Sequence, residues 1–427
     1  MDPLLPDDTV LMQQPAHLRY MDGLRAVAVL GVIFYHAIGE ASWAWPWLEA
    51  PISAQPAWWF ATFASKGSHG VDLFFVISGF CLSYPVLARL RREGTAPFDV
   101  RGFLARRMIR ILPPFYVAFA LFAAWMIATQ VAGVVRPTGM GVEHSPLKLL
   151  GQLFFLDRGA NFPNGSFWTL SIEFRWYLAF PLVLALYVYS QRAFFTLLAA
   201  CVVAFNFTTF RAIDIATLPA FMLGIVAADW QLTGHRFRKY APILGLIALD
   251  VALVLEPYSS QPSRWGLADE AGFFVQTNVG WQLFAFCLVV AAGTLPALRR
   301  FFELRALCAV GVAAYSIYLT HQPIIDIWSE HAGLRVAPVW SFSGAVALSL
   351  LAGFAFWLFG ERPFVERPLR PLLISWLEPK VAAVLTFIGV PVRFALSSPV
   401  IPAVDAIREP EASVVPAPVV AAQGSVA

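Results

Sequence analysis

The sequence predicts an all-α polytopic membrane protein, with about ten transmembrane helices in one bundle and no soluble catalytic domain. Hydrophobic residues make up 59% of the 427 residues and charged residues only 13%, whereas charges make up about 25% of a typical soluble chain. The apolar residues lie in runs of about 20, the length that crosses a bilayer as a helix. Arginines gather in alternate connections between these runs, which is typical of loops that stay on one side of a membrane.

Each apolar run defines one predicted span. The first run is expected to remain as a span, because the polar stretch before it has no basic segment and no small-residue cleavage site of a signal peptide. Residues 193–230 form two spans separated by a short turn at Arg211 and Asp214, or one span plus a re-entrant piece. The predicted spans lie near 19–39, 70–88, 111–132, 166–188, 193–208, 212–230, 241–257, 272–294, 306–328 and 339–360.

The regions outside the spans complete the domain organisation. The apolar run after Lys380 is broken by Pro391 and Arg393, so it is expected to lie on the membrane surface as a helix and not to form another span. Residues 45–64 are rich in tryptophan and proline and are expected at the interface. The parts are a cytoplasmic N-terminal segment (1–18), a transmembrane domain (19–370), an interfacial helix (371–398) and a disordered cytoplasmic tail (399–427).

Basic residues predict the orientation. Loops rich in arginine and lysine stay in the cytoplasm, and the connection between the second and third spans carries much more arginine than acid. With ten spans both termini are then cytoplasmic, and the protein is expected in the cell (inner) membrane. The arginines of this connection are Arg89, Arg91, Arg92, Arg101, Arg106, Arg107 and Arg110.

Charge and cysteine usage exclude other kinds of site. A net charge of +3 is too small to indicate nucleic-acid binding, so the predicted environment is the lipid bilayer. The cysteines show neither a disulfide framework nor the spacing of metal ligands, because all of them fall inside apolar runs. They are Cys81, Cys201, Cys287 and Cys308. No metal site is predicted, and the oligomeric state stays open.

The first predicted helix carries ionisable residues where lipid-facing side chains are expected. In LRYMDGLRAVAVLGVIFYHAIG (18–39), Asp22, Arg25 and His36 interrupt an apolar run. Arg25 and His36 are eleven residues apart, so they share one helical face and lie ~16 Å apart along the axis. Ionisable groups inside a membrane are usually functional. The alternative is a membrane anchor in which Arg25 reaches the interface and His36 is a packed core residue.

This stretch resembles the start of the acyltransferase-3 family of integral membrane acyltransferases, in which an arginine is followed by ten residues and a histidine. The resemblance runs over residues 18–370, in the order expected for the family. It is carried further by GVDLFFVISGF (70–80), the pair Arg107 and Arg110, WTLSIEFRWYLAFP (168–181) and YSIYLTHQP (315–323). It implies a membrane O-acyltransferase that moves an acyl group, most often acetyl, from cytosolic acyl-CoA to a hydroxyl of a carbohydrate or other acceptor at the outer face.

The candidate site residues separate by depth. Span limits and orientation place His36, Glu173 and His321 in the outer half of the membrane. Arg25 lies in the inner part of the first span, with Arg107 and Arg110 at the inner mouth of the third. The resemblance assigns Arg107 and Arg110 to the acyl-CoA donor, and the forked donors of arginine suit phosphate. The alternative, if the resemblance is set aside, is that Arg107 and Arg110 are ordinary arginines that anchor the cytoplasmic side of the membrane protein.

Chemistry assigns roles to the outer group. His36 is predicted to be the general base, because histidine accepts a proton near neutral pH. Glu173 is predicted to orient an imidazole, as the carboxylate does in a catalytic triad, although an ion pair with another helix is the alternative. His321 is the further catalytic candidate that the resemblance supplies. Gly79 is expected to allow close packing of two helices.

A second class of function stays open. A proton-coupled transporter or flippase would also place histidine, glutamate and arginine inside the membrane. The sequence shows no corresponding pair of interrupted helices in two halves, which such transporters commonly have. Acyl transfer without an ion gradient would distinguish the enzyme from the transporter.

Overall fold

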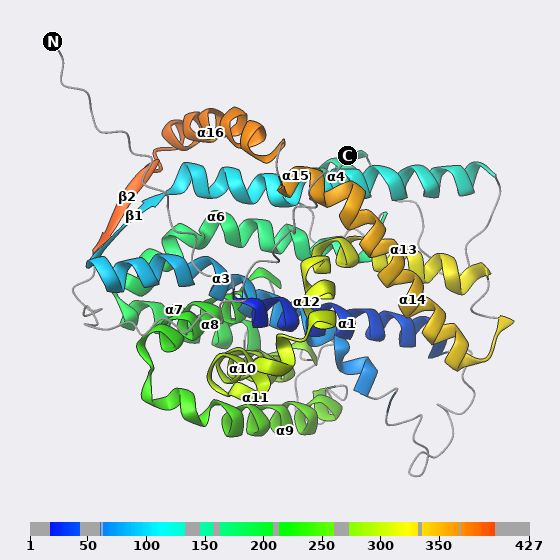
Figure 1. The fold of residues 1–427 in the computed structure, drawn as a ribbon, viewed down its shortest axis with the longest axis horizontal. Coiled ribbons are helices and arrows are strands. Elements are labelled where there is room, and N and C mark those ends of the chain that lie inside the picture. The colour runs from blue at the N-terminus through cyan, green and yellow to red at the C-terminus, as the bar shows by residue number, and fades with distance from the viewer. Residues whose placement is uncertain are drawn as a thin grey trace, which may run out of the picture.

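The computed structural model describes residues 18–42, 60, 63–132, 146–156, 163–207, 213–259, 273–331, 335–366 and 369–397. Within this part the chain is almost entirely helical, as predicted. The segments expected as the N-terminal cytoplasmic segment, the tryptophan-rich interfacial loop and the C-terminal tail lie wholly or mostly outside the described residues. Most long helices run side by side along the long axis of the molecule, and α14 crosses them obliquely (Figure 1).

The long helices follow the predicted apolar runs. They are α1 (Arg19–Ser42), α3 (Gly70–Glu93), α4 (Val100–Val131), α6 (Trp168–Tyr189), α7 (Gln191–Phe207), α8 (Ile213–Thr233), α9 (Ala241–Ser259), α10 (Phe273–Thr294), α13 (Ala314–His331), α14 (Pro338–Phe356) and α16 (Leu369–Phe387). Short elements join them: η2 (Lys66–His69), β1 (Thr95–Asp99), α5 (Pro146–Leu153), η3 (Gly165–Phe167), η4 (Arg236–Tyr240), α11 (Pro296–Phe302), α12 (Arg305–Val312), the π-helical turn η8 (Trp357–Glu361), α15 (Arg362–Val365) and β2 (Arg393–Ser397).

The described helices support a multi-pass membrane protein. Six of them, in some cases with a short flanking turn, are long and apolar enough to cross a membrane, and a seventh is reached if the bent pair α10 and α11 is one span. The all-α membrane class is supported, but the predicted count of ten spans is not confirmed. Helices α7 and α8 are separate, in agreement with two elements over 193–230, but α7 has only 17 residues.

The predicted ninth span, 306–328, is not one helix. The chain ends α12 at Val312 and begins α13 at Ala314, and α12 stands across the long axis in Figure 1. Helix α12 packs on α1 so closely that a Cβ on Gly311 would lie 1.9 Å from the carbonyl oxygen of Asp22. This contact brings the first helix against the segment that leads into α13.

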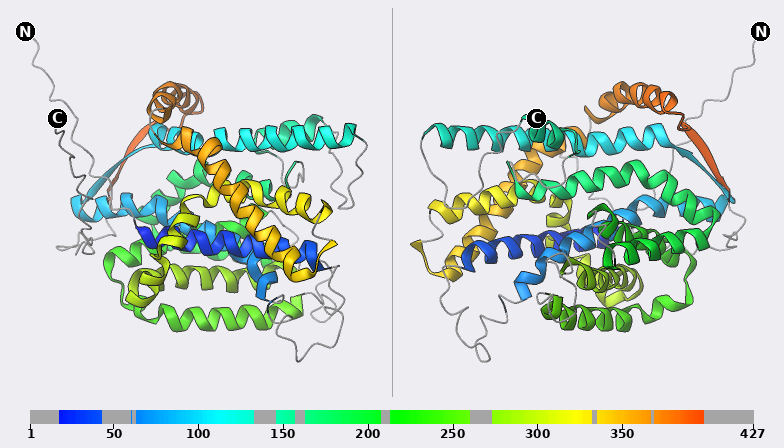
Figure 2. Two further views of the ribbon diagram at one scale, coloured as in Figure 1. Left: turned by 45° about the vertical axis from the view of Figure 1, so that its right-hand side comes forward. Right: turned by 180° about the vertical axis from the view of Figure 1, so that it is seen from behind.

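The expected surface helix 371–398 also needs correction at its end. Helix α16 ends at Phe387, and a turn with Gly389 at φ +72° follows, a backbone conformation that suits glycine. Strand β2 then pairs antiparallel with β1, Thr95 opposite Ser397. In the left view of Figure 2 α16 is seen end-on while α4 runs across the picture, so α16 crosses α4 steeply.

Two features hold α3 to α8. Gly79 lies against the backbone of α8, where a Cβ would be 2.0 Å from the Phe221 carbonyl oxygen, so the packing role predicted for Gly79 is confirmed. Farther along α3, the buried Arg91 pairs with Asp229 of α8, which also accepts a hydrogen bond from Tyr187 of α6 at 2.9 Å. Arg91 is thus a buried structural residue and not a solvent-exposed loop charge.

Candidate active site

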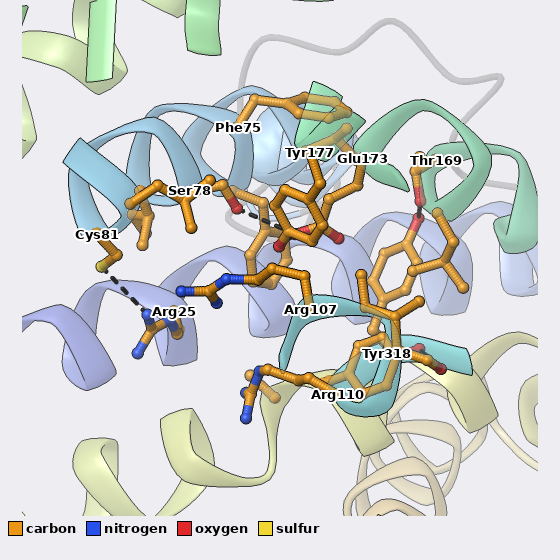
Figure 3. A pocket seen from close by; sticks show the side chains of 18 of the residues that line it. Arg25, Phe75, Ser78, Cys81, Arg107, Arg110, Thr169, Glu173, Tyr177 and Tyr318 are labelled. Atoms are coloured by element: carbon orange, nitrogen blue, oxygen red, sulfur yellow. Dashed lines mark hydrogen bonds between the residues drawn. The ribbon is translucent and has the colours of Figure 1, made fainter. Parts of the chain in front are cut away.

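A pocket opens between α1, α3, α4, α6 and α13, and arginines from two of these helices line it. Arg25 of α1 enters from one side, and Arg107 and Arg110 of α4 enter from another (Figure 3). Apolar side chains of α3 and α6 form much of the remaining wall, as do Tyr315 and Tyr318 of α13. We call this cavity the inner pocket; its volume is about 110 Å³. The structure therefore brings together the three arginines that the sequence singled out.

Arg107 has no carboxylate partner within salt-bridge distance among the described residues. Its guanidinium lies 5.8 Å from the ring centroid of Phe103 and 5.7 Å from that of Tyr177. These rings hold the charge on the pocket wall without neutralising it. A guanidinium with free N–H donors facing a pocket is suited to binding an anion.

Arg25 is held in place by its own helix and by α3. One terminal nitrogen donates to Asp22 at 2.9 Å, one turn earlier, and the other donates to the sulfur of Cys81 at 3.2 Å. Asp22 is 4% exposed, so this pair is well shielded from solvent. The Asp22 contact fixes the direction in which Arg25 enters the inner pocket.

Arg110 faces a carboxylate that the sequence did not single out. Glu361, on the π-helical turn η8, is 2% exposed and lies 3.8 Å from the Arg110 guanidinium. The hydroxyl of Ser316 donates to the other oxygen of Glu361 at 2.6 Å. Glu361 follows a long apolar run and reads as the first charge of a loop, so only the packing of α4 and α13 against η8 reveals its role.

A second cavity, the mouth, adjoins the inner pocket and shares Arg25, Arg107 and Arg110 with it. The mouth is larger, about 320 Å³, and adds Arg106 of α4 and Arg370 of α16 to the lining. Partial burial lowers the pKa of the Arg370 guanidinium, and the charges of Arg110 and Arg106 lower it further. The two cavities and their arginines form the arginine end of the site.

Glu173 lies in the inner pocket beside Tyr177. The hydroxyl of Ser78 on α3 donates to a Glu173 oxygen at 3.0 Å, and the Tyr177 hydroxyl donates to the same oxygen. Among the described residues, no hydrogen bond joins Glu173 to an imidazole. The structure thus places Glu173 in the pocket that Arg107 also lines, with hydroxyl partners in place of the predicted imidazole.

His36 and His321 meet although they come from different helices. Their ring centroids are 5.2 Å apart, His36 on α1 and His321 on α13. The His36 ring also lies against Tyr35, and the described part of the chain gives it no hydrogen-bond partner. The predicted clustering of the two histidines is present in the structure, and we call this region the histidine end.

The surroundings of His321 fix its tautomer. Nδ1 lies 2.8 Å from the Tyr318 carbonyl oxygen, which can only accept, so Nδ1 carries the proton. In the neutral ring Nε2 is then the acceptor, and it lies 3.3 Å from the hydroxyl of Ser166. The Ser166 hydroxyl has a single proton, which is shared between Nε2 and the Gln322 side-chain oxygen 2.7 Å away. The carbonyl of Tyr318 thus supplies the orientation that was expected of Glu173.

Tyr318 connects the two ends of the site. Its side chain lines the inner pocket, and its ring centroid is 5.3 Å from that of His321. The Tyr318 hydroxyl accepts from Thr169 at 2.7 Å and donates to the Ser166 carbonyl at 3.1 Å. Asn164 caps η3, accepting from the Ser166 amide and donating to the Leu319 carbonyl, both at 2.8 Å. These bonds tie η3 and the start of α6 to α13 and hold Ser166 in reach of His321.

Comparison with known sequences identifies the family of the chain. A family described as an acyltransferase domain matches residues 18–358. The chain belongs to the acyltransferase-3 family. This match covers the arginines of α1 and α4, Glu173 and both histidines. It ends before Glu361 and Arg370.

Similar sequences include two proteins named as O-acetyltransferases and one named as a nodulation protein. O-acetyltransferase OatA of Staphylococcus aureus (strain NCTC 8325 / PS 47) is 23% identical over 391 residues, covering 84% of this chain but 58% of OatA. A putative O-acetyltransferase, SAS0844, of strain MSSA476 is 23% identical over 390 residues, covering 83% of this chain and 59% of the relative. Nodulation protein 10 of Rhizobium leguminosarum bv. viciae is 26% identical over 396 residues, covering 84% of this chain and 96% of the relative. No solved structure matches the chain.

Proposed function

We propose that this acyltransferase-3 member is a membrane O-acyltransferase that takes an acyl group from cytosolic acyl-CoA at the arginine end. The acyl group, acetyl in the simplest case, passes to a hydroxyl acceptor, such as a carbohydrate, that reaches the histidine end from the outer face. One observation carries the proposal: the pocket lined by the unpaired Arg107 is also lined by Tyr318, whose ring contacts His321, the partner of His36. O-acetyltransferase names among the relatives support the acetyl donor.

The arginine end suits the donor by charge. Acyl-CoA carries a diphosphate and a 3′-phosphate, and Arg107, Arg110 and Arg25 present guanidinium groups toward one space. In this proposal Arg107 and Arg110 hold phosphate oxygens, and the pantetheine arm extends into the inner pocket. Arg25 lies ~16 Å along α1 from His36, so the arm bridges the two ends while the phosphates stay at the mouth.

Acyl transfer then requires one base. The acceptor oxygen attacks the thioester carbonyl carbon, the carbon–sulfur bond breaks, and CoA leaves as a thiolate that takes up a proton. His36 accepts the acceptor's hydroxyl proton, because the described residues leave both of its ring nitrogens free of hydrogen bonds. Tyr318 fixes the tautomer of His321, so Nε2 of His321 faces Ser166 of η3. In this proposal His321 supports the transfer of the proton to His36.

Glu173 acts as a positioning residue in this proposal. It shares the inner pocket with Arg107 and accepts from Ser78 and Tyr177, so it ties α3 to α6 where the acyl arm passes. A carboxylate beside an unpaired guanidinium also keeps that guanidinium in the pocket when the donor is absent.

The test uses the purified full chain in nanodiscs with acetyl-CoA labelled in the acetyl group and a cell-envelope fraction as the source of acceptor. No ion gradient is present. The proposal predicts release of free CoA thiol together with alkali-labile label in the envelope fraction. Thiol release at the rate of a protein-free control would contradict the proposal. In that case, uptake of the label by sealed vesicles that contain the chain, only under a proton gradient, would indicate a transporter.

A further inference from the structure

The mouth is completed by two helices, α15 and α16, that lie outside the part of the chain that matches the family. Phe364 and Val365 of α15 and Arg370 of α16 line it together with Arg106. Residues 18–358 match the family, so these side chains come from the C-terminal segment that follows. Helix α16 is seated on α4 through buried Val381 and Leu385. Arg370 lies at the exposed start of this helix, 11 residues before Val381.

The positive charge of the mouth is only partly balanced. Arg25 pairs with Asp22, and Arg110 faces Glu361. In the part of the chain that the structure describes, Arg106, Arg107 and Arg370 have no carboxylate within salt-bridge distance. Several guanidinium groups facing one cavity repel each other, and a polyanion in that cavity would relieve the repulsion. An anion that carries several charges would thus be stabilised in the mouth.

The arginines lie at two depths. Arg25, Arg107 and Arg110 line both cavities, whereas Arg106 and Arg370 line the mouth alone. Acyl-CoA has its own order along the molecule: acyl group, pantetheine, diphosphate, then ribose with the 3′-phosphate and adenine. Because the histidines lie beyond the inner pocket, the acyl group enters first and the nucleotide stays in the mouth. The larger volume of the mouth suits the nucleotide, and the smaller inner pocket suits the slender arm.

We propose that Arg370, together with Arg106, binds the 3′-phosphate of CoA, while Arg107 and Arg110 bind the diphosphate. The inference rests on the proposed function and adds to it a specificity-determining residue from the C-terminal segment. The 3′-phosphate distinguishes CoA from dephospho-CoA and from phosphopantetheine. Arg370 consequently selects among donors that carry the same acyl group.

Lys380 provides a matched control on the same helix. Its ammonium lies 3.5 Å from the ring centroid of Trp376 and donates to the Trp376 carbonyl oxygen at 2.9 Å. It does not line the mouth. Lys380→Gln removes the same charge from α16 as Arg370→Gln, so any general effect of surface charge appears in both variants.

The experiment measures the Kd of acetyl-CoA and of acetyl-dephospho-CoA for the purified full chain and its variants. We expect the unmodified chain to bind acetyl-CoA about 10- to 100-fold more tightly than acetyl-dephospho-CoA, the range for a charge-assisted phosphate contact. Arg370→Gln should lose most of that ratio, and Arg370→Lys should keep part of it. Arg107→Gln should weaken both ligands by similar factors, and Lys380→Gln should change neither.

Other outcomes overturn particular claims. If Arg370→Gln keeps the full ratio while melting at the temperature of the unmodified chain, Arg370 does not bind the 3′-phosphate. If it weakens both ligands equally, Arg370 binds the diphosphate and the assignment by depth is wrong. If the unmodified chain binds acetyl-CoA and acetyl-dephospho-CoA equally, the mouth does not read the 3′-phosphate at all. Binding of neither ligand would contradict the proposed function itself.

Discussion

The imidazoles of His36 and His321 have unequal environments although their ring centroids are only 5.2 Å apart. His321 is completely buried, and Tyr318 and Ser166 engage both of its nitrogens. His36 is half-buried and makes ring contacts only, within the part of the chain that is described. A base must be free to take a proton, so this difference favours His36 as the base. His321 is then the imidazole that packs against His36.

Replacing His36 with alanine should therefore remove acyl transfer and leave the fold intact. Loss of a general base typically lowers turnover by about 10²- to 10⁴-fold. Within the described part of the chain, His36 has no hydrogen bond whose loss would loosen the bundle. Turnover of labelled acetyl-CoA and the melting temperature in detergent are the two measurements. His331→Ala, at an exposed histidine near the end of α13, is the control. Near-normal turnover in a folded His36→Ala protein would contradict the assignment.

A second prediction for a single residue concerns Arg107. Arg107→Gln should weaken acetyl-CoA binding about 10-fold or more, because a guanidinium without a carboxylate partner loses its phosphate contact outright. Lysine at this position should restore binding only in part, since it lacks the forked donors. Arg89→Gln, which breaks an exposed pair with Glu93, should leave the Kd unchanged. Equal Kd values for all three proteins would return Arg107 to the role of a membrane anchor.

Residue spacing predicts some of the site and misses the rest. The eleven-residue interval between Arg25 and His36 places both on one face of a helix, and the structure has them on α1 as expected. Ser166 and Glu361 could not be found in this way. A serine after a loop and a glutamate at the end of an apolar run are common, and only the folding of η3 and η8 against α13 gives them partners.

At the scale of elements, a buried ion pair links three helices at one place. Arg91 of α3 and Tyr187 of α6 both contact Asp229 of α8. A buried pair of this kind contributes little over an apolar equivalent, but removing one partner leaves a buried charge uncompensated, which costs about 3–5 kcal/mol. The junction therefore holds α3, α6 and α8 in one relative position as long as it is complete.

The neighbouring Arg91 and Arg92 on α3 allow a test of whether the buried ion pair stabilises the bundle. Arg91→Leu should lower the melting temperature of the detergent-purified protein markedly, because it strands Asp229. Arg92→Leu should change it little, because Arg92 is exposed and its pair with Glu93 is solvated. Leucine at 91 combined with Asp229→Leu should recover much of the loss. Equal melting temperatures of the two single variants would show that the buried pair does not stabilise the bundle.

Contacts between elements that lie far apart in the chain could not be predicted from the sequence. Hydropathy marks α12 and α13 as one run, since Val312 and Ala313 are as apolar as their neighbours, and the break follows from packing of α12 on α1. Pairing of β1 with β2 joins residues about 300 positions apart, with no local signal. Helices α3, α4 and α6 were predictable because each is an apolar run of sufficient length.

For the whole molecule, transfer across the membrane requires the arginine end to face the cytoplasm and the histidine end to face outward. Arg92, Lys239 and Arg300 are exposed and belong to connections predicted as cytoplasmic, whereas exposed Arg335 follows α13 on the opposite side. Single cysteines at these positions, in a chain whose native cysteines are replaced, report sidedness with an impermeant thiol reagent.

A cysteine in place of Arg335 should label in intact cells. Cysteines in place of Arg92, Lys239 and Arg300 should label only after lysis. Labelling of the Lys239 position in intact cells would show that one helix of the pair α7 and α8 does not cross the membrane. That result would place the connection between α8 and α9 on the outer side.

The most direct test of acyl transfer across the membrane places the donor on one side of the membrane and the acceptor on the other. The full chain is reconstituted in liposomes, with acetyl-labelled CoA supplied only on the side of the arginine end and an envelope glycan fraction only on the other side. We expect alkali-labile acetyl ester on the glycan and free CoA left on the donor side, with neither product formed by His36→Ala. Acetyl-CoA recovered intact on the glycan side, or ester formed only when both substrates share a side, would contradict transfer across the membrane.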